Sequence, residues 1–214
     1  GGDVAEGIEI DGAPADDSPI GTSVGSAYIF RRDGSSWVQQ QKLVASDTAA
    51  YNSFGNSVAI EGDTIVVGAA YDGATRGRGV NSGSVYIFKR NDNGTPTNLD
   101  DDFWEQKQKL LPTVGVAYDY FGIAVGVSGD TIIVGASQAN PLGAYGNGAA
   151  YIYRFNGTTW IEEQKLLALD GAFGDRFGWS VAVSGDTALV GAYLDHDPVL
   201  GTGSAYMFGR INSV

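Results

Sequence analysis

Short apolar segments recur along the chain, and the grading of their apolar and polar positions predicts β-strands. Residues 64–69 (TIVVGA) and 131–136 (TIIVGA) are almost continuously apolar, which is typical of an inner strand covered on both faces. Residues 104–110 (WEQKQKL) and 160–167 (WIEEQKLL) carry charged and amide side chains. Such segments suit an exposed sheet edge, where Lys and Glu discourage further strand pairing. Because no stretch keeps a helical period over three turns, the pattern predicts an all-β fold.

These strands belong to a repeated unit. The tripeptide Gly-Asp-Thr is centred on Asp63, Asp130 and Asp186, which are 67 and 56 residues apart. Each unit contains four short strands, a to d, which in the clearest unit are residues 54–60, 64–69, 84–88 and 104–110. Four strands graded from apolar to polar, at this period, are typical of a β-propeller blade. We therefore expect a β-propeller of four-stranded antiparallel blades, with units at roughly residues 1–45, 46–111, 112–168 and 169–214.

The two terminal units are incomplete in this interpretation. The first contains strands b-c-d, the last contains a-b-c, and the middle two are complete. The 214 residues are then either a single closed four-bladed domain or a segment of a larger ring that further blades or a second chain complete. Open ends would expose strand edges, which favours closure by another element.

Glycine has two predicted roles in each unit. Gly62 and its equivalents stand first in a two-residue turn between strands a and b, where glycine supplies a positive φ. A second glycine lies inside strand b, where the missing side chain lets another backbone approach closely. The strand-b glycines are Gly68, Gly135 and Gly191.

The Phe-Gly and Gly-Ala pairs that frame strands a and b resemble the FG-GAP repeat. The three clear copies are Phe54-Gly55 with Gly68-Ala69, Phe121-Gly122 with Gly135-Ala136, and Phe177-Gly178 with Gly191-Ala192. A degenerate copy covers residues 10–17. The resemblance implies a β-propeller like that of integrin α-subunits. The sequence of the repeats is most similar to the form found in bacterial surface or secreted proteins. It therefore implies an extracellular or cell-surface location.

One departure from this family concerns calcium. Integrin-type copies insert an Asp-rich calcium loop between strands a and b, whereas this chain has only short turns such as residues 61–64 (EGDT). One aspartate in a two-residue turn cannot supply the six to eight oxygens that Ca²⁺ takes. We therefore expect no metal site and no cofactor, although calcium binding elsewhere stays open.

Composition excludes several other classes. A formal net charge of −12 and a pI near 4.3 argue against a nucleic-acid partner. No apolar run approaches the length of a membrane span, so no membrane insertion is expected. His196 is the only histidine, and no nucleophile-elbow or phosphate-loop motif is present, so we expect no enzyme. A carbohydrate-active enzyme using a carboxylate pair is a distant alternative.

Binding is the preferred function. In an a-b-c-d blade the b–c and d–a connections share one face, and these loops differ between copies whereas the a–b turns barely change. Tyrosine and aspartate in these loops suit the stacking or anchoring of a glycan or protein ligand. The candidate residues are Tyr51, Tyr71, Asp72, Tyr118, Asp119, Tyr120, Tyr145, Phe173, Tyr193 and Asp195. We expect a non-catalytic adhesion module, with a self-assembling structural subunit that joins copies through open blade edges as the alternative.

Overall fold

Strands account for all the helical or strand structure that the computed structural model describes, which covers residues 8–19, 21–73, 79–95, 98, 101–139, 146–196 and 201–210. The all-β prediction is confirmed. The first sheet, in the order β1-β2-β3, contains β1 (Ile8–Ala13), β2 (Ser26–Asp33) and β3 (Ser36–Leu43). The second, β4-β5-β6-β7, contains β4 (Ser57–Glu61), β5 (Thr64–Ala69), β6 (Ser84–Asn91) and β7 (Phe103–Leu110). The third, β8-β9-β10-β11, contains β8 (Phe121–Ser128), β9 (Thr131–Ala136), β10 (Ala149–Phe155) and β11 (Trp160–Leu166). The fourth, β12-β13-β14, contains β12 (Phe177–Ser184), β13 (Thr187–Ala192) and β14 (Ser204–Gly209).

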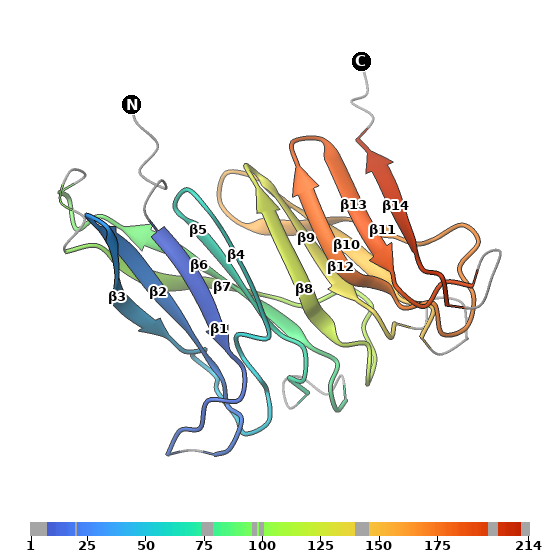
Figure 1. Cartoon of the computed structure of the whole chain (residues 1–214), viewed down its shortest axis with the longest axis horizontal. Coiled ribbons are helices and arrows are strands. Elements are labelled where there is room, and N and C mark those ends of the chain that lie inside the picture. The colour runs from blue at the N-terminus through green and yellow to red at the C-terminus, as the bar shows by residue number, and fades with distance from the viewer. Residues whose placement is uncertain are drawn as a thin grey trace.

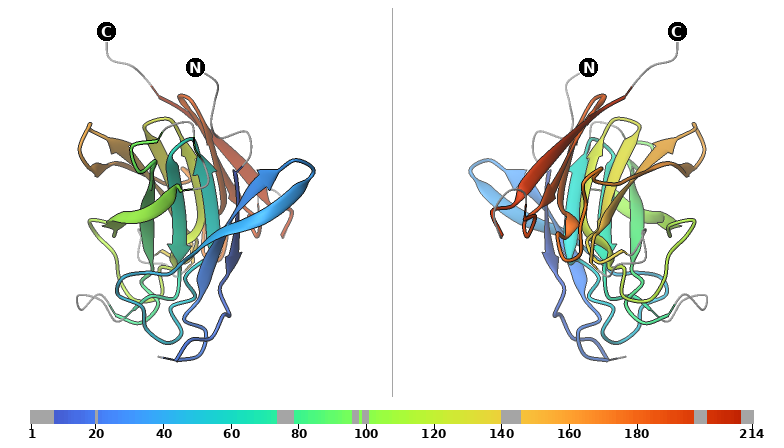
Figure 2. Two further views of the ribbon diagram at one scale, coloured as in Figure 1. Left: turned by 90° about the vertical axis from the view of Figure 1, so that its left-hand side faces the viewer. Right: turned by 90° about the vertical axis from the view of Figure 1, so that its right-hand side faces the viewer.

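Each sheet is a propeller blade, because its strands pair antiparallel in chain order. The middle two sheets have all four strands, the first lacks strand a and the last lacks strand d, as predicted. Figure 1 shows the four sheets in a row, with the first and last at opposite ends. In the end-on views of Figure 2 the outer strands of different sheets point in different directions, so the row fans rather than stacks flat. The described sheets thus form an open arc.

The hydrophobic core lies between neighbouring sheets. Ile29 of β2 and Leu43 of β3 pack with Ile65 and Val67 of β5 in one core, and two similar cores follow along the row. The side chains of strand b are covered on both faces in the second and third sheets. Burial between blades therefore explains why these strands are almost continuously apolar.

The phenylalanine of each Phe-Gly pair is a core residue. Phe54 packs edge-on against Tyr86 of β6, with ring centroids 5.3 Å apart, and Phe121 packs against Tyr151 of β10 at 5.4 Å. Phe177 repeats the arrangement in the last sheet. In the second sheet Phe54 precedes β4, so this strand begins three residues later than predicted. Such aromatic pairs stabilise a fold by about 0.5–1.5 kcal/mol beyond their buried area.

The strand-b glycines let the backbone of the next sheet come close. A Cβ placed on Gly68 would lie 2.1 Å from the carbonyl oxygen of Gly122, and one on Gly135 would lie 1.9 Å from that of Gly178. The prediction is confirmed at these two positions. Gly191 differs, because no atom of a following sheet lies near it among the described residues.

The a–b turns tie strand a to strand c within each sheet. Gly62 has a φ of 53°, as the turn requires, and its two equivalents have φ values of 56° and 53°. The turn aspartate Asp63 accepts a hydrogen bond from Arg90 Nε at 2.6 Å, and Asp130 accepts one from Arg154 at the same distance. The repeated Gly-Asp-Thr phrase is therefore part of the scaffold.

Candidate binding face

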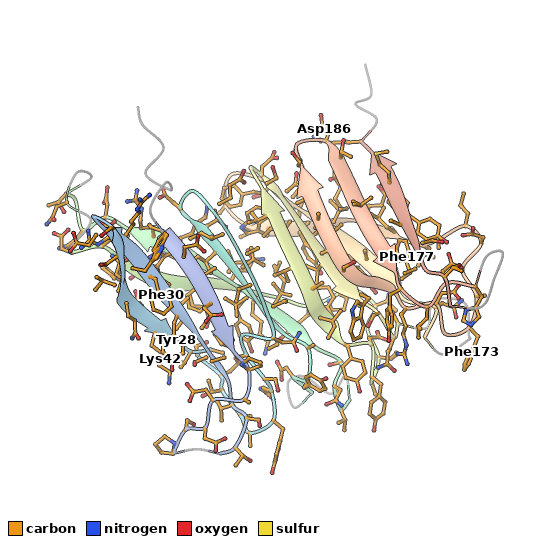
Figure 3. All side chains as sticks on the ribbon, viewed as in Figure 1. Tyr28, Phe30, Lys42, Phe173, Phe177 and Asp186 are labelled. Carbon is orange, nitrogen blue, oxygen red and sulfur yellow. The ribbon has the colours of Figure 1, made fainter. Side chains whose placement is uncertain are left out.

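The b–c and d–a connections lie together on one face of the arc, which we call the loop face. Its described residues are 14–19, 21–25, 44–56, 70–73, 79–83, 111–120, 137–139, 146–148, 167–176, 193–196 and 201–203. Figure 3 shows Phe173 on this face and Asp186, in a turn between strands a and b, at the opposite one. The two variable loop sets therefore share a surface that the near-constant a–b turns do not reach.

Hydrogen bonds join each d–a loop to the b–c loop of the preceding sheet. The backbone N–H of Tyr51 donates to Thr22 O at 2.9 Å, and that of Tyr118 donates to Val80 O at 2.9 Å. At the third boundary between sheets, Arg176 donates in the same way to Gly146 O at 3.0 Å. The loop face is therefore a connected surface across all three boundaries.

Two tyrosines of these loops have a left-handed backbone and an exposed side chain. Tyr51 has a φ of 66° and Tyr118 a φ of 67°. This conformation costs a residue with a side chain about 1–2 kcal/mol. Nevertheless the side chains are 68% and 50% exposed, so their burial does not offset the strain. The equivalent Gly174 has a φ of 94°, so the left-handed backbone belongs to the repeated loop, and two of its three copies place an exposed tyrosine there.

Further aromatic side chains form pairs on the loop face. Tyr71 and Tyr120 stack edge-on across the boundary between the second and third sheets, with centroids 5.2 Å apart. Tyr193 packs against Trp179 at 4.8 Å. Phe173 is 71% exposed, and Tyr145 lies outside the described residues. The structure therefore distributes aromatic rings along the whole loop face.

Trp179 is a member of this surface that sequence reasoning missed. It lies in β12, where the repeat predicts scaffold, yet it is 46% exposed. A bulge between Phe177 and Ser180 shifts the register at this point. The sequence does contain one signal for Trp179: the equivalent residues of the other two copies, Asn56 and Ile123, are not aromatic, so the tryptophan departs from the repeat.

The candidate aspartates are buried. The Asp72 carboxylate accepts hydrogen bonds from Ser84 at 2.8 Å and Lys109 at 2.6 Å. Tyr86 Oη lies 3.4 Å from the same carboxylate and 2.8 Å from Asp47. Burial raises the pKa of Tyr86 well above its usual range, so it donates at any working pH. Asp72 therefore holds loops and strands together instead of facing a ligand.

The other two candidate aspartates also point inward. Asp195 accepts a hydrogen bond from Tyr206 at 2.8 Å. Asp119 accepts one from the backbone of Val116 at 2.8 Å, and burial raises the pKa of Asp119 although this bond opposes the shift. These carboxylates are buried and accept hydrogen bonds from internal donors, so contact with a ligand stays a prediction for them.

The third sheet lacks the acids that surround Tyr86 in the second. Val114 and Ala139 occupy the positions of Asp47 and Asp72. Lys165, the equivalent of Lys109, lies 5.1 Å above the ring of Tyr151. Burial lowers the pKa of Lys165, with Asp119 and Glu162 opposing the shift. The internal anchoring of the loops thus differs between sheets that have the same fold.

Aliphatic side chains are exposed among the aromatic rings of the loop face. They are Val44, Val80, Val114, Val116 and Leu169. They lie in the same loops as the exposed tyrosines, although the face also exposes polar residues such as Asp47 and Asp170. Exposed apolar side chains on one surface of a soluble protein mark a candidate interaction site.

Four-stranded sheets packed face to face in chain order define a β-propeller-type module. The chain belongs to the FG-GAP repeat family, whose model matches residues 37–88, 104–153 and 160–208, more than half of the sequence. Each match starts in the outer strand of one sheet and ends in the third strand of the next. A search of curated proteins finds no match to the chain.

Two further tests concern metals and membranes. Within the described ranges, no group of three or more His, Cys, Asp or Glu side chains is arranged to hold a metal ion. The same ranges contain no helix long and apolar enough to cross a membrane.

Proposed function

We propose that this chain is a non-catalytic interaction module of an extracellular or cell-surface protein, and that it binds a protein partner through the loop face. The observation that carries the proposal is the pair of exposed tyrosines, Tyr51 and Tyr118, held in a strained backbone at equivalent positions. A backbone held in one conformation loses little entropy when a partner buries its side chain. FG-GAP repeats are typical of extracellular or surface proteins, which supports the location.

The chemistry of the loop face favours a protein over a glycan. A sugar needs polar groups at the ring edges to satisfy its hydroxyls, and the carboxylates of Asp72 and Asp195 serve internal donors. Exposed valine and leucine beside aromatic rings match the apolar centre of a protein interface. Aromatic residues in such centres are typical hot spots, and truncating one costs about 2 kcal/mol or more.

Binding to panels of purified surface and matrix proteins, and to a glycan array, tests the proposal. We expect a protein ligand whose affinity falls about 30-fold on Tyr118→Ala, the equivalent of about 2 kcal/mol. Trp37→Ala is the matched control, because Trp37 is 48% exposed but lies in β3, away from the loop face. The proposal would be contradicted by a ligand that no longer binds the Trp37→Ala variant but still binds the Tyr118→Ala and Tyr51→Ala variants. Glycan ligands alone, lost on Tyr118→Ala, would reassign the same face to carbohydrate.

A further inference from the structure

Glutamine side chains link the outer strands of successive sheets. Gln41 of β3 accepts a hydrogen bond from Trp104 N at 2.7 Å and donates one to Trp104 O at 3.0 Å. Gln108 of β7 makes the same pair with Trp160, at 2.8 and 2.7 Å. Each carboxamide therefore binds the backbone of the next outer strand at its tryptophan.

Gln164 of β11 is the third member of this series. It is exposed, and no hydrogen bond of its side chain is found in the described part of the chain. Figure 1 shows β14 at the end of the row, where the last sheet has no outer strand. Gln164 therefore faces the position that an outer strand of the last sheet would take.

A groove of about 610 Å³ occupies that position. It is lined by Gln164, by Ile152 and Leu166 of the third sheet, and by Phe208 of β14. The equivalents of the last three in the first two sheets are Ile29, Leu43 and Phe88, which share a core with the buried Trp104. The walls of the groove thus reproduce the site that already holds a tryptophan side chain.

Two carboxylates of the last sheet match a lysine of the outer strand that this sheet lacks. In the second sheet, Lys109 of the outer strand binds Asp47 at 2.7 Å and Asp72 at 2.6 Å. In the last sheet, Asp170 and Asp195 occupy the equivalent positions and converge on Tyr206. A lysine five residues after the tryptophan would meet the same two carboxylates.

An arginine that lines the groove could pair with an acidic residue of the bound strand. Arg90 of the second sheet forms a buried ion pair with Asp102, two residues before Trp104, at 2.9 Å. Arg210 is the equivalent of Arg90 and lines the groove. Of the outer strands in this chain, β7 with its preceding Asp102 therefore offers the most complete complement.

We propose that the groove between β11 and β14 binds an extended strand of the type Asp-x-Trp-x-x-x-Gln-Lys-Leu, which pairs antiparallel with β14 and is held by Gln164. The proposal continues the interface that the chain builds twice within itself. It does not depend on the loop face. A second copy is a poorer occupant, because its strands of this type, β3, β7 and β11, are already paired in their own sheets.

A dye-labelled peptide of residues 101–111 (DDFWEQKQKLL), titrated with the 214-residue chain and followed by fluorescence anisotropy, tests the proposal. We expect saturable binding. The same peptide with Trp104→Ala should bind about 30-fold more weakly, because it leaves the indole site empty. Gln164→Ala in the protein should weaken binding about tenfold, through the loss of two hydrogen bonds. Tyr118→Ala, on the loop face, is the matched control and should change nothing.

Three results would overturn the proposal. The first is the absence of saturable binding by a chain whose circular dichroism shows that it is folded. The second is binding that neither Trp104→Ala in the peptide nor Gln164→Ala in the protein weakens. The third is a stable dimer of the chain, measured by light scattering, that Gln164→Ala dissociates, because the occupant would then be a second copy.

Discussion

Gly135→Ala should destabilise the fold because a methyl group there collides with the backbone of the next sheet. The new Cβ would lie 1.9 Å from Gly178 O and 3.0 Å from its carbonyl carbon. A backbone carbonyl cannot rotate away, so the two sheets must separate by about 1 Å, and overpacking of this kind costs about 3 kcal/mol. Alanine recovers about 0.5–1 kcal/mol by restricting the unfolded chain. The net loss should be about 2–2.5 kcal/mol.

Gly191→Ala is the matched control. Gly191 has the same place in strand b and no positive φ, but its nearest neighbour is the hydroxyl of Ser180, which can rotate. Its substitution should change the free energy of unfolding by less than about 1 kcal/mol. Urea unfolding followed by tryptophan fluorescence measures the free energy of unfolding of both variants. In thermal unfolding, Gly135→Ala should lower Tm by about 5–10 °C. Equal losses for the two variants would refute the view that interblade backbone approach explains these glycines.

Three other substitutions test the internal chemistry of the loops. Asp119→Asn should raise the free energy of unfolding at pH 7. The pKa of Asp119 is raised in the folded state, so its ionised form is disfavoured there. The gain should vanish well below pH 3.8, where the carboxyl group is protonated in both the folded and the unfolded chain. Asp72→Ala should cost about 3 kcal/mol in a urea titration, by leaving the buried ammonium of Lys109 with one partner fewer. Tyr118→Gly should stabilise the chain by about 0.5 kcal/mol, since glycine tolerates the left-handed backbone, and a loss in the same titration would contradict the strain.

Much of the candidate site follows from the sequence. Loops that vary beside turns that repeat mark the loop face, and tyrosines such as Tyr51 and Tyr118 are visible as its candidate residues, which the structure shows to be exposed. The direction of the aspartates is not visible, because the partners of Asp72 include Lys109, 37 residues away in another strand. The exposure of Trp179 is not visible either, because it depends on how β12 packs: the equivalent Ile123 of β8 lies in the equivalent bulge and is partly buried.

The sequence by itself determines the strands, the turns and the four-stranded unit, because these depend on local apolar patterning and on glycine at fixed positions. It also predicts the close approach of another backbone at the strand-b glycines, which the structure confirms for Gly68 and Gly135. Only the tertiary structure decides which backbone that is, which carboxylates are buried, and that the first and last sheets lie apart. All three properties depend on how each sheet packs against its neighbour. The curvature of the row in particular results from many contacts between residues that are distant in the sequence. The groove beside Gln164 is the clearest such case. It is recognised only by comparison with the two sites at Gln41 and Gln108, each of which binds the outer strand of the next sheet.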